Sequence, residues 1–238
     1  MQVIEIFASI QGEGKFIGAP STFVRFTGCN LRCFYCDSRY AWDSEAGQDL
    51  TPAEIVSEVR DRERRHVVLT GGEPLVQQST GLRELCKALS RDARVVTVET
   101  NATLLPGPGL IAYVDLWSLS PKLSSARLQD PPNWKEVVAH VTWRVSRRQA
   151  QIKFVIADEQ DMLEAAEYAR TARGLHYILQ PEGYAAYDGA TRAEAIAHYM
   201  NSYQGLVRLA REHFPIDEVS VQILPQLHVL AWGHQRGV

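Results

Sequence analysis

The chain carries the stretch Cys29-Asn-Leu-Arg-Cys33-Phe-Tyr-Cys36, which places three of its four cysteines in one short segment. Three thiolates this close in sequence can turn inward on a single inorganic centre. Iron–sulfur clusters are normally held by four cysteine thiolates, and no fourth cysteine lies nearby. The pattern therefore predicts a cluster held by three cysteines, with one iron left open to bind another ligand.

Two other uses of these cysteines have to be weighed. A disulfide framework is disfavoured, because three cysteines cannot pair evenly and the chain has the character of an intracellular protein. Structural zinc normally takes four ligands with paired C-x2-4-C spacing, and neither a second pair nor a histidine lies close in sequence. Zinc remains a rival from spacing alone. The remaining cysteine, Cys86, is interpreted as a small buried hydrophobic residue on a helix face.

The composition favours a soluble protein that acts on a small molecule. The 238 residues are 45% hydrophobic and 22% charged, with a formal net charge of -3, which disfavours nucleic acid or anionic membrane as a partner. The first residues lack the basic and apolar regions of a signal peptide, and no apolar run approaches the roughly 18 residues of a membrane span. We expect one cytoplasmic domain, 1–238.

Strand and helix patterns alternate along most of the chain, which predicts parallel strands joined by right-handed crossovers. About six such strands follow the first glycine turn, too few for a closed eight-stranded barrel. The expected fold is therefore an α/β fold of the incomplete (β/α) barrel type. Residues 121–148 are expected to form loops with a short helix. The expected strands cover residues 3–6, 22–27, 66–70, 94–100, 113–119, 151–157, 176–179 and 219–224.

Polar side chains follow several of these strands at the point where each strand ends. Gly71-Gly-Glu-Pro74 follows one strand, and the segments 99–101, 118–122 and 180–182 follow three others. Ligands gather at the carboxyl ends of the strands in parallel α/β folds. We therefore expect these groups to share one site with the cysteine segment, although the Gly-Gly-Glu-Pro sequence by itself could be only a tight turn.

The segment Ile10-Gln-Gly-Glu-Gly14 allows two interpretations. It could be a glycine-rich hairpin, or Gln11 and Glu13 could recognise the donor edge of a heterocycle such as a pterin or a guanine. Arg25, on the following strand, could be a surface charge or could bind a substrate carboxylate.

The cysteine segment resembles the C-x3-C-x-aromatic-C signature of the radical S-adenosylmethionine (SAM) enzymes, with Tyr35 in the aromatic position. Together with IQGEG, TGGEP, S-x-S-P-K and a tail of the form LPQLH…WG…RGV, the chain resembles the 7-carboxy-7-deazaguanine synthases from its first residues to its last. The resemblance implies a carbon–nitrogen lyase of queuosine and 7-deazapurine biosynthesis. Its substrate would be 6-carboxy-5,6,7,8-tetrahydropterin, and a 5′-deoxyadenosyl radical would abstract hydrogen at C6 before ring contraction, loss of ammonia and regeneration of SAM.

The same resemblance implies a set of cofactor residues. Cys29, Cys33 and Cys36 would hold a 4Fe–4S cluster. Ser38 takes the position of the family's Mg2+ ligand, where threonine is more frequent, and its hydroxyl keeps the hard oxygen that Mg2+ prefers. The residues expected to contact SAM are Tyr35, Cys36, Asp37, Gly72, Glu73, Ser120, Pro121, Lys122 and Gln180.

The substrate residues implied by the resemblance come from both ends of the chain. Gln226 and His228 are expected in a loop after the last strand, although a lone histidine is more often structural. Val238 would bring its terminal carboxylate to the guanidine-like edge of the substrate. The full set is Ile10, Gln11, Gly12, Glu13, Arg25, Thr70, Gln226, His228 and Val238.

Two other functions remain as alternatives. Another radical SAM enzyme, such as a glycyl-radical activase, would need a groove for a protein partner and would have no use for IQGEG and the LPQLH tail. A non-catalytic zinc or iron–sulfur module would not need the GGEP and SPK segments. For the leading interpretation, the family resemblance implies a homodimer and a flavodoxin- or ferredoxin-type reductant.

Overall fold

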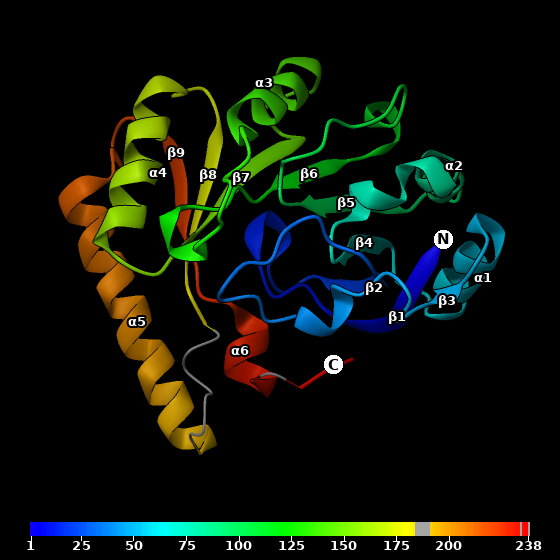
Figure 1. Ribbon diagram of the computed structural model, residues 1–238, viewed down its shortest axis with the longest axis horizontal. Coiled ribbons are helices and arrows are strands. Elements are labelled where there is room, and N and C mark those ends of the chain that lie inside the picture. Colours follow the sequence, from blue (N-terminus) through cyan, green and yellow to red (C-terminus); the bar gives the residue numbers. More distant parts are fainter. Residues whose placement is uncertain (184–190, 234, 238) are drawn as a thin grey trace.

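A computed structural model describes residues 1–183, 191–233 and 235–237. One sheet runs through the described part of the chain, in the strand order β3-β1-β2-β4-β5-β6-β7-β8-β9, and helices lie outside it (Figure 1). The strands are β1 (Gln2–Ile10), β2 (Pro20–Phe26), β3 (Gln48–Asp49), β4 (His66–Gly71), β5 (Val95–Thr100), β6 (Leu116–Leu119), β7 (Ala150–Ile156), β8 (His176–Pro181) and β9 (Ser220–Ile223). The α-helices are α1 (Pro52–Asp61), α2 (Leu82–Arg91), α3 (Trp134–Arg144), α4 (Glu159–Thr171), α5 (Arg192–His213) and α6 (Leu227–Trp232).

The sheet is a partial barrel, as the sequence predicts. The strands from β2 to β9, β3 excepted, pair in parallel with their neighbours. Strand β1 runs antiparallel to β2, and the short β3 is antiparallel to β1. Seven strands are parallel among the described residues, which agrees with the expected number of about six. Because β3 and β9 stand at opposite ends of the order, the barrel is not closed.

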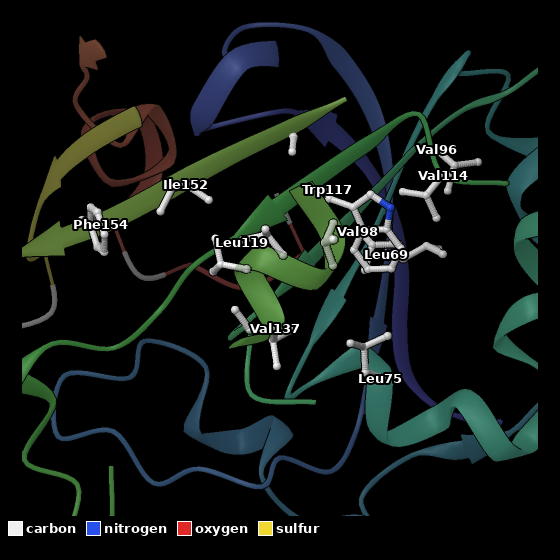
Figure 2. Packing of buried hydrophobic residues seen from close by; sticks show 14 of the residues in the cluster. Leu69, Leu75, Val96, Val98, Val114, Trp117, Leu119, Val137, Ile152 and Phe154 are labelled. Carbon is white, nitrogen blue, oxygen red and sulfur yellow. The ribbon is translucent and has the colours of Figure 1, made fainter. Parts of the chain in front are cut away.

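Side-chain alternation along the parallel strands separates an apolar outer face from a polar inner face. Leu69, Val98 and Trp117 are register neighbours on β4, β5 and β6, and they pack together in the core under the helices (Figure 2). The next residues along β4 and β5, Thr70 and Glu99, point to the opposite face, where their side chains are hydrogen-bonded to each other. The interior of this barrel is therefore polar.

A buried histidine closes the interior near the start of the strands. The His66 ring lies 2.7 Å (Nδ1) from the Ser21 hydroxyl and 2.8 Å (Nε2) from the Thr97 hydroxyl. Burial lowers the pKa of His66 to about 4, so the ring is neutral at physiological pH and can both donate and accept. Phe16 packs against the ring from the first turn, with the two ring centroids 4.8 Å apart.

The helix starts are explained by capping. Thr51 and Glu54 form the capping box that the sequence Thr51-Pro-Ala-Glu54 predicts at α1, with Pro52 in the first turn, and the Asp158 carboxylate accepts from Asp161 N–H at the start of α4. The sequence also predicts a long helix over residues 190–213; its first residue lies outside the described residues, and α5 begins at Arg192. In Figure 1, α1 and α2 lie at one end of the sheet, and α4 and α5 at the other. None of the described helices is long and apolar enough to span a membrane.

The structure corrects the sequence interpretation of the tail. Residues 227–232 form helix α6 rather than a loop, so His228 lies in its first turn and Gln226 is its N-cap. This helix returns to the N-terminal part of the chain (Figure 1), where Leu227 N–H donates to Gly12 C=O at 2.9 Å. The sequence does not indicate this helix, because the helix is only six residues long and has no side-chain cap.

Candidate active site

A cavity of about 280 Å³ lies at the carboxyl ends of the parallel strands and collects most of the predicted site residues. It also contains Glu99, from the expected polar segment 99–101, and residues that the sequence did not single out, among them Lys153, Tyr40 and Arg236. The predicted residues that line it are Ile10, Gln11, Gly12, Glu13, Arg25, Cys29, Cys33, Tyr35, Cys36, Asp37, Ser38, Thr70, Gly72, Ser120, Lys122, Gln226 and His228. Segments more than 200 residues apart therefore share one site.

Four predicted residues are not among those lining the cavity. Glu73 and Gln180 are fully buried, and the Gln180 side chain donates to Pro225 C=O at 3.4 Å. Pro121 is buried next to two residues that do line the cavity. Val238 lies outside the described residues, so its expected contact with substrate stays a prediction.

The three cysteine thiols face the cavity from the loop that follows β2. Gly28 opens this loop with a φ of 84°, a conformation that favours glycine. Leu31 N–H donates to Cys29 Sγ at 3.4 Å, and the Asn101 amide lies 4.0 Å from the same sulfur. Burial raises the pKa of the Cys29 thiol to about 11 and also raises that of Cys33, so a bound metal centre would be what keeps them as thiolates.

The donor set fits an iron–sulfur cluster. Three soft sulfur ligands line one wall of a cavity, and N–H donors approach a sulfur as they do around such clusters. Within the described residues, no three histidine, cysteine or acidic side chains converge closely enough to hold a single metal ion. The thiolates of a cluster each bond a different iron, so they need not converge in that way. Cys29, Cys33 and Cys36 could therefore hold a cluster beside the cavity.

The Gly-Gly-Glu-Pro turn is packed against the start of the cysteine loop. Gly71 has a φ of 132°, and a Cβ at Gly72 would strike the carbonyl oxygen of Gly28. Gly72 N–H donates to Phe26 C=O at 3.0 Å, and Glu73 N–H donates to Gly28 C=O at 2.8 Å. A Cβ atom at either position would clash with the backbone of Phe26 or Gly28, which explains why both residues are glycine.

The Glu73 carboxylate is used to join two loops and not to line the cavity. It accepts from Leu75 N–H at 3.0 Å and from Asn101 N–H at 2.7 Å. Burial raises the pKa of Glu73, while these backbone donors act in the opposite direction by favouring the carboxylate. The side chain thus connects the end of β4 to the end of β5, where it orients Asn101 toward the cysteine loop.

An ion pair inside the barrel connects three distant segments. Lys153 on β7 pairs with the Glu13 carboxylate, and Gln226 Nε2 donates to the other carboxylate oxygen at 2.6 Å. Burial would raise the pKa of Glu13, but Lys153 and then His228 lower it to about 2. Burial alone would lower the pKa of Lys153, but the neighbouring Glu13 carboxylate outweighs this effect and raises it. The only sequence signal for Lys153 was a lysine within a largely apolar strand.

Glu99 organises the neighbouring part of the inner face. One of its carboxylate oxygens accepts from the Gln11 amide at 3.0 Å, and the other accepts from the Thr70 hydroxyl at 3.0 Å. Gln11 also accepts from Glu13 N–H through its side-chain oxygen at 3.1 Å. The donor and acceptor atoms of Gln11 are therefore assigned by their neighbours, and its amide has one orientation.

Arg25 is not a free surface charge. Its Nε lies 2.6 Å from the Glu5 carboxylate, which also accepts from the Tyr40 hydroxyl at 3.0 Å. The guanidinium of Arg236 lies 3.3 Å from the centre of the Tyr40 ring. The chain end is thus brought against the group that surrounds Arg25, on the same wall of the cavity.

Helix α6 closes the cavity against the first glycine turn. A Cβ at Gly12 would overlap the ring of His228, so this position tolerates no side chain beside the histidine. On the opposite side, Lys122 Nζ donates to the Ser120 hydroxyl at 3.1 Å, and Ser38 Oγ lies 3.9 Å from Cys36 Sγ. The cavity therefore has a sulfur-rich side and a side formed by the two ends of the chain.

Comparison with known proteins identifies this arrangement. The Radical SAM superfamily model matches residues 23–116. The 7-carboxy-7-deazaguanine synthase of Pyrobaculum aerophilum is 36% identical over 241 aligned positions, which cover 100% of this chain and 97% of the relative. The chain belongs to the 7-carboxy-7-deazaguanine synthase family. The Bacillus subtilis synthase is 32% identical, with 99% and 98% of the two chains covered.

A solved structure supports the fold of this synthase-family chain. The crystal structure of QueE from Escherichia coli superposes with a TM-score of 0.61 at 21% identity and covers 93% of both chains. As a member of the family, this chain is a radical SAM enzyme, and its cofactors are a 4Fe–4S cluster and SAM.

We predict that Glu73→Gln destabilises the protein by about 2 kcal/mol, because an amide NH2 would face one of the two backbone N–H donors. Urea unfolding of the anaerobically reconstituted protein measures the change. Glu58→Gln is the matched control, since Glu58 is an exposed carboxylate in an i,i+4 pair with Arg62 and should cost less than about 0.5 kcal/mol. Unchanged stability together with lost SAM binding would instead assign Glu73 to the cofactor.

We predict that Lys153→Met makes activity sensitive to mild acid. Burial then raises the pKa of Glu13 from about 2 toward or above its ordinary value of 4.5, so protonation removes the acceptor. The value of kcat/KM should fall by about twofold or more as the pH is lowered from 8 to 5, because protonation of Glu13 then sets in within this range. Lys153→Arg, which keeps the positive charge, should retain the flat profile of the parent. Flat profiles for all three proteins would contradict this role of the pair.

Proposed function

We propose that this protein converts 6-carboxy-5,6,7,8-tetrahydropterin to 7-carboxy-7-deazaguanine with loss of ammonia, as a carbon–nitrogen lyase. The observation that carries the proposal is that IQGEG and the LPQLH tail, at opposite ends of the chain, meet in the cavity that the three cysteines line. A cluster module without a substrate would need neither segment. An activase would need room for a protein chain, whereas this cavity of about 280 Å³ suits a small molecule.

We propose that the sulfur-rich side of the cavity binds the cofactors. Cys29, Cys33 and Cys36 would hold the cluster, and the Gly72 carbonyl would accept from the amino group of SAM, since the Gly72 N–H already donates to Phe26 C=O. When bound, the cluster and SAM supply a radical that abstracts hydrogen from the substrate. Ser120 and Lys122 also line the cavity, where Lys122 is close enough to Cys33 to lower the pKa of its thiol against the larger effect of burial, and they would orient the rest of SAM.

We propose that the other side binds the pterin. The Glu13 carboxylate, kept ionised by Lys153, would accept from the amino and ring N–H groups of the pterin edge. Gln11, held by Glu99, would match the neighbouring carbonyl and N–H. Because Glu5 takes the Nε of Arg25, the terminal NH2 groups of this guanidinium would donate to the substrate carboxylate.

Three further expectations are proposals of the same kind. The protein would work in the cytoplasm, where thiols stay reduced, and would assemble as a homodimer. A flavodoxin- or ferredoxin-type protein would supply the electron.

The test is anaerobic reconstitution followed by assay of the carboxylated tetrahydropterin. We expect about four irons and four sulfides per chain, SAM-dependent turnover, and ring-contracted product with ammonia. Cys29→Ala should lose the cluster, whereas Cys86→Ala, which changes a thiol buried in the apolar core, should retain it. One zinc per chain without SAM cleavage would overturn the proposal, and SAM cleavage without ring contraction would leave another radical SAM enzyme.

We propose Ser38 as a Mg2+ ligand, because its hydroxyl lines the cavity next to the cysteine loop and Mg2+ is held by few protein ligands. Ser38→Ala should remove the stimulation of turnover by added Mg2+, which we expect to fall to within about twofold of the metal-free rate. Iron content should stay at the parental level. Ser38→Thr, which keeps the oxygen, is the control. An unchanged Mg2+ response in Ser38→Ala would exclude this residue as a ligand.

A further inference from the structure

The cysteine loop has a second face that the cavity does not use. Side chains of the three cysteines and Tyr35 line the cavity, whereas Arg32 and Phe34, which alternate with them along the chain, do not. Phe34 exposes 54% of its surface, and Arg32 is also exposed. A large apolar ring held in water, between two cysteines that would hold the cluster, calls for an explanation.

Cationic side chains lie around this part of the cysteine loop. The guanidinium of Arg127 lies 4.1 Å from the centre of the Phe34 ring. Arg39 donates to Phe34 C=O, and Arg32 donates to the carbonyls of Cys29 and Leu31 at 2.6 and 2.8 Å. Neither Arg32 nor Arg127 forms an ion pair with a carboxylate in the described parts of the chain.

The patch is fixed to the fold and is not a chance grouping of mobile side chains. Phe34 N–H donates to Ala126 C=O at 3.0 Å, which joins the cysteine loop to the turn that carries Arg127. Ser125, in the same turn, donates to Asp161 on α4 at 2.5 Å. Arg127 has a φ of 53°, so its side chain leaves the turn in a direction set by an uncommon backbone conformation.

We propose that the patch formed by Arg32, Phe34, Arg39 and Arg127 is the docking surface for an acidic one-electron carrier protein. The inference rests on the proposed cluster at the three cysteines. An electron from a protein has to enter from outside the cavity, and Phe34 is bonded directly to Cys33 on the outer face. Positive charge around an apolar centre matches the small, electrostatically steered interfaces of electron-transfer partners.

The test compares two ways of reducing the cluster in Arg127→Glu. Reduced acidic flavodoxin is mixed with the reconstituted protein, and cluster reduction is followed by its absorbance without pterin present. We expect the rate to fall about tenfold and to lose most of its dependence on ionic strength. Reduction by dithionite, a small ion that needs no docking surface, should be unchanged, and Arg127→Lys should restore the rate with flavodoxin.

Arg144→Glu is the matched control. Arg144 is an exposed arginine that stacks on an exposed aromatic ring, Trp143, with 5.3 Å between the guanidinium and the ring centre, and the variant makes the same change in net charge. It should behave as the parent. An unaltered rate of Arg127→Glu with flavodoxin, an equal loss with dithionite, or a change in the oligomeric state of Arg127→Glu would each overturn the proposal. Because no pterin is needed, failure of the proposed synthase reaction would not affect this result.

Discussion

The site depends on one buried ion pair, between Glu13 and Lys153. Two charges removed from water are stable only when their geometry and remaining hydrogen bonds compensate for lost hydration. Here Gln226 supplies the additional donor, and His228 adds a favourable interaction with the carboxylate. Because the partners lie 140 and 213 residues from Glu13, satisfying this pair brings the first turn, β7 and the tail together. The substrate side of the cavity is a consequence of that requirement.

Such a pair requires a polar barrel interior, which is unusual for parallel strands buried on both faces. Polar side chains inside the barrel form hydrogen bonds at two levels along the strands. His66 bridges two hydroxyls near the strand starts, and Glu99 bridges Gln11 and Thr70 nearer the strand ends. Each of these side chains is thereby paired with groups on neighbouring strands or loops. Apolar packing is left to the outer face, where Trp117 and its register neighbours meet the helices (Figure 2).

The sequence predicted local features well, because they depend on neighbouring residues. The capping box at Thr51 and the cap at Asp158 follow from a few adjacent side chains. Most strand ends followed from local apolar patterns, although β1 runs to Ile10 and not to residue 6. It could not predict the partners of Arg25 and Glu13, because these depend on register between distant segments. Glu73 shows the same limit: its motif does not reveal that its carboxylate accepts from the backbone N–H groups of Leu75 and Asn101, because Asn101 follows a different strand.

The cysteine loop has to satisfy two opposite demands. Radical chemistry requires a cavity closed to water, whereas a cluster at the same loop must still receive an electron from outside. Alternation of side chains in a short loop meets both demands at once. The thiols and Tyr35 face the cavity, and Arg32 and Phe34 face solvent. Because Phe34 is exposed and is bonded directly to Cys33, which lines the cavity, a cluster there would remain close to the surface while α6 packs on the substrate side. The cavity face and the outer face are therefore two sides of the same cysteine loop.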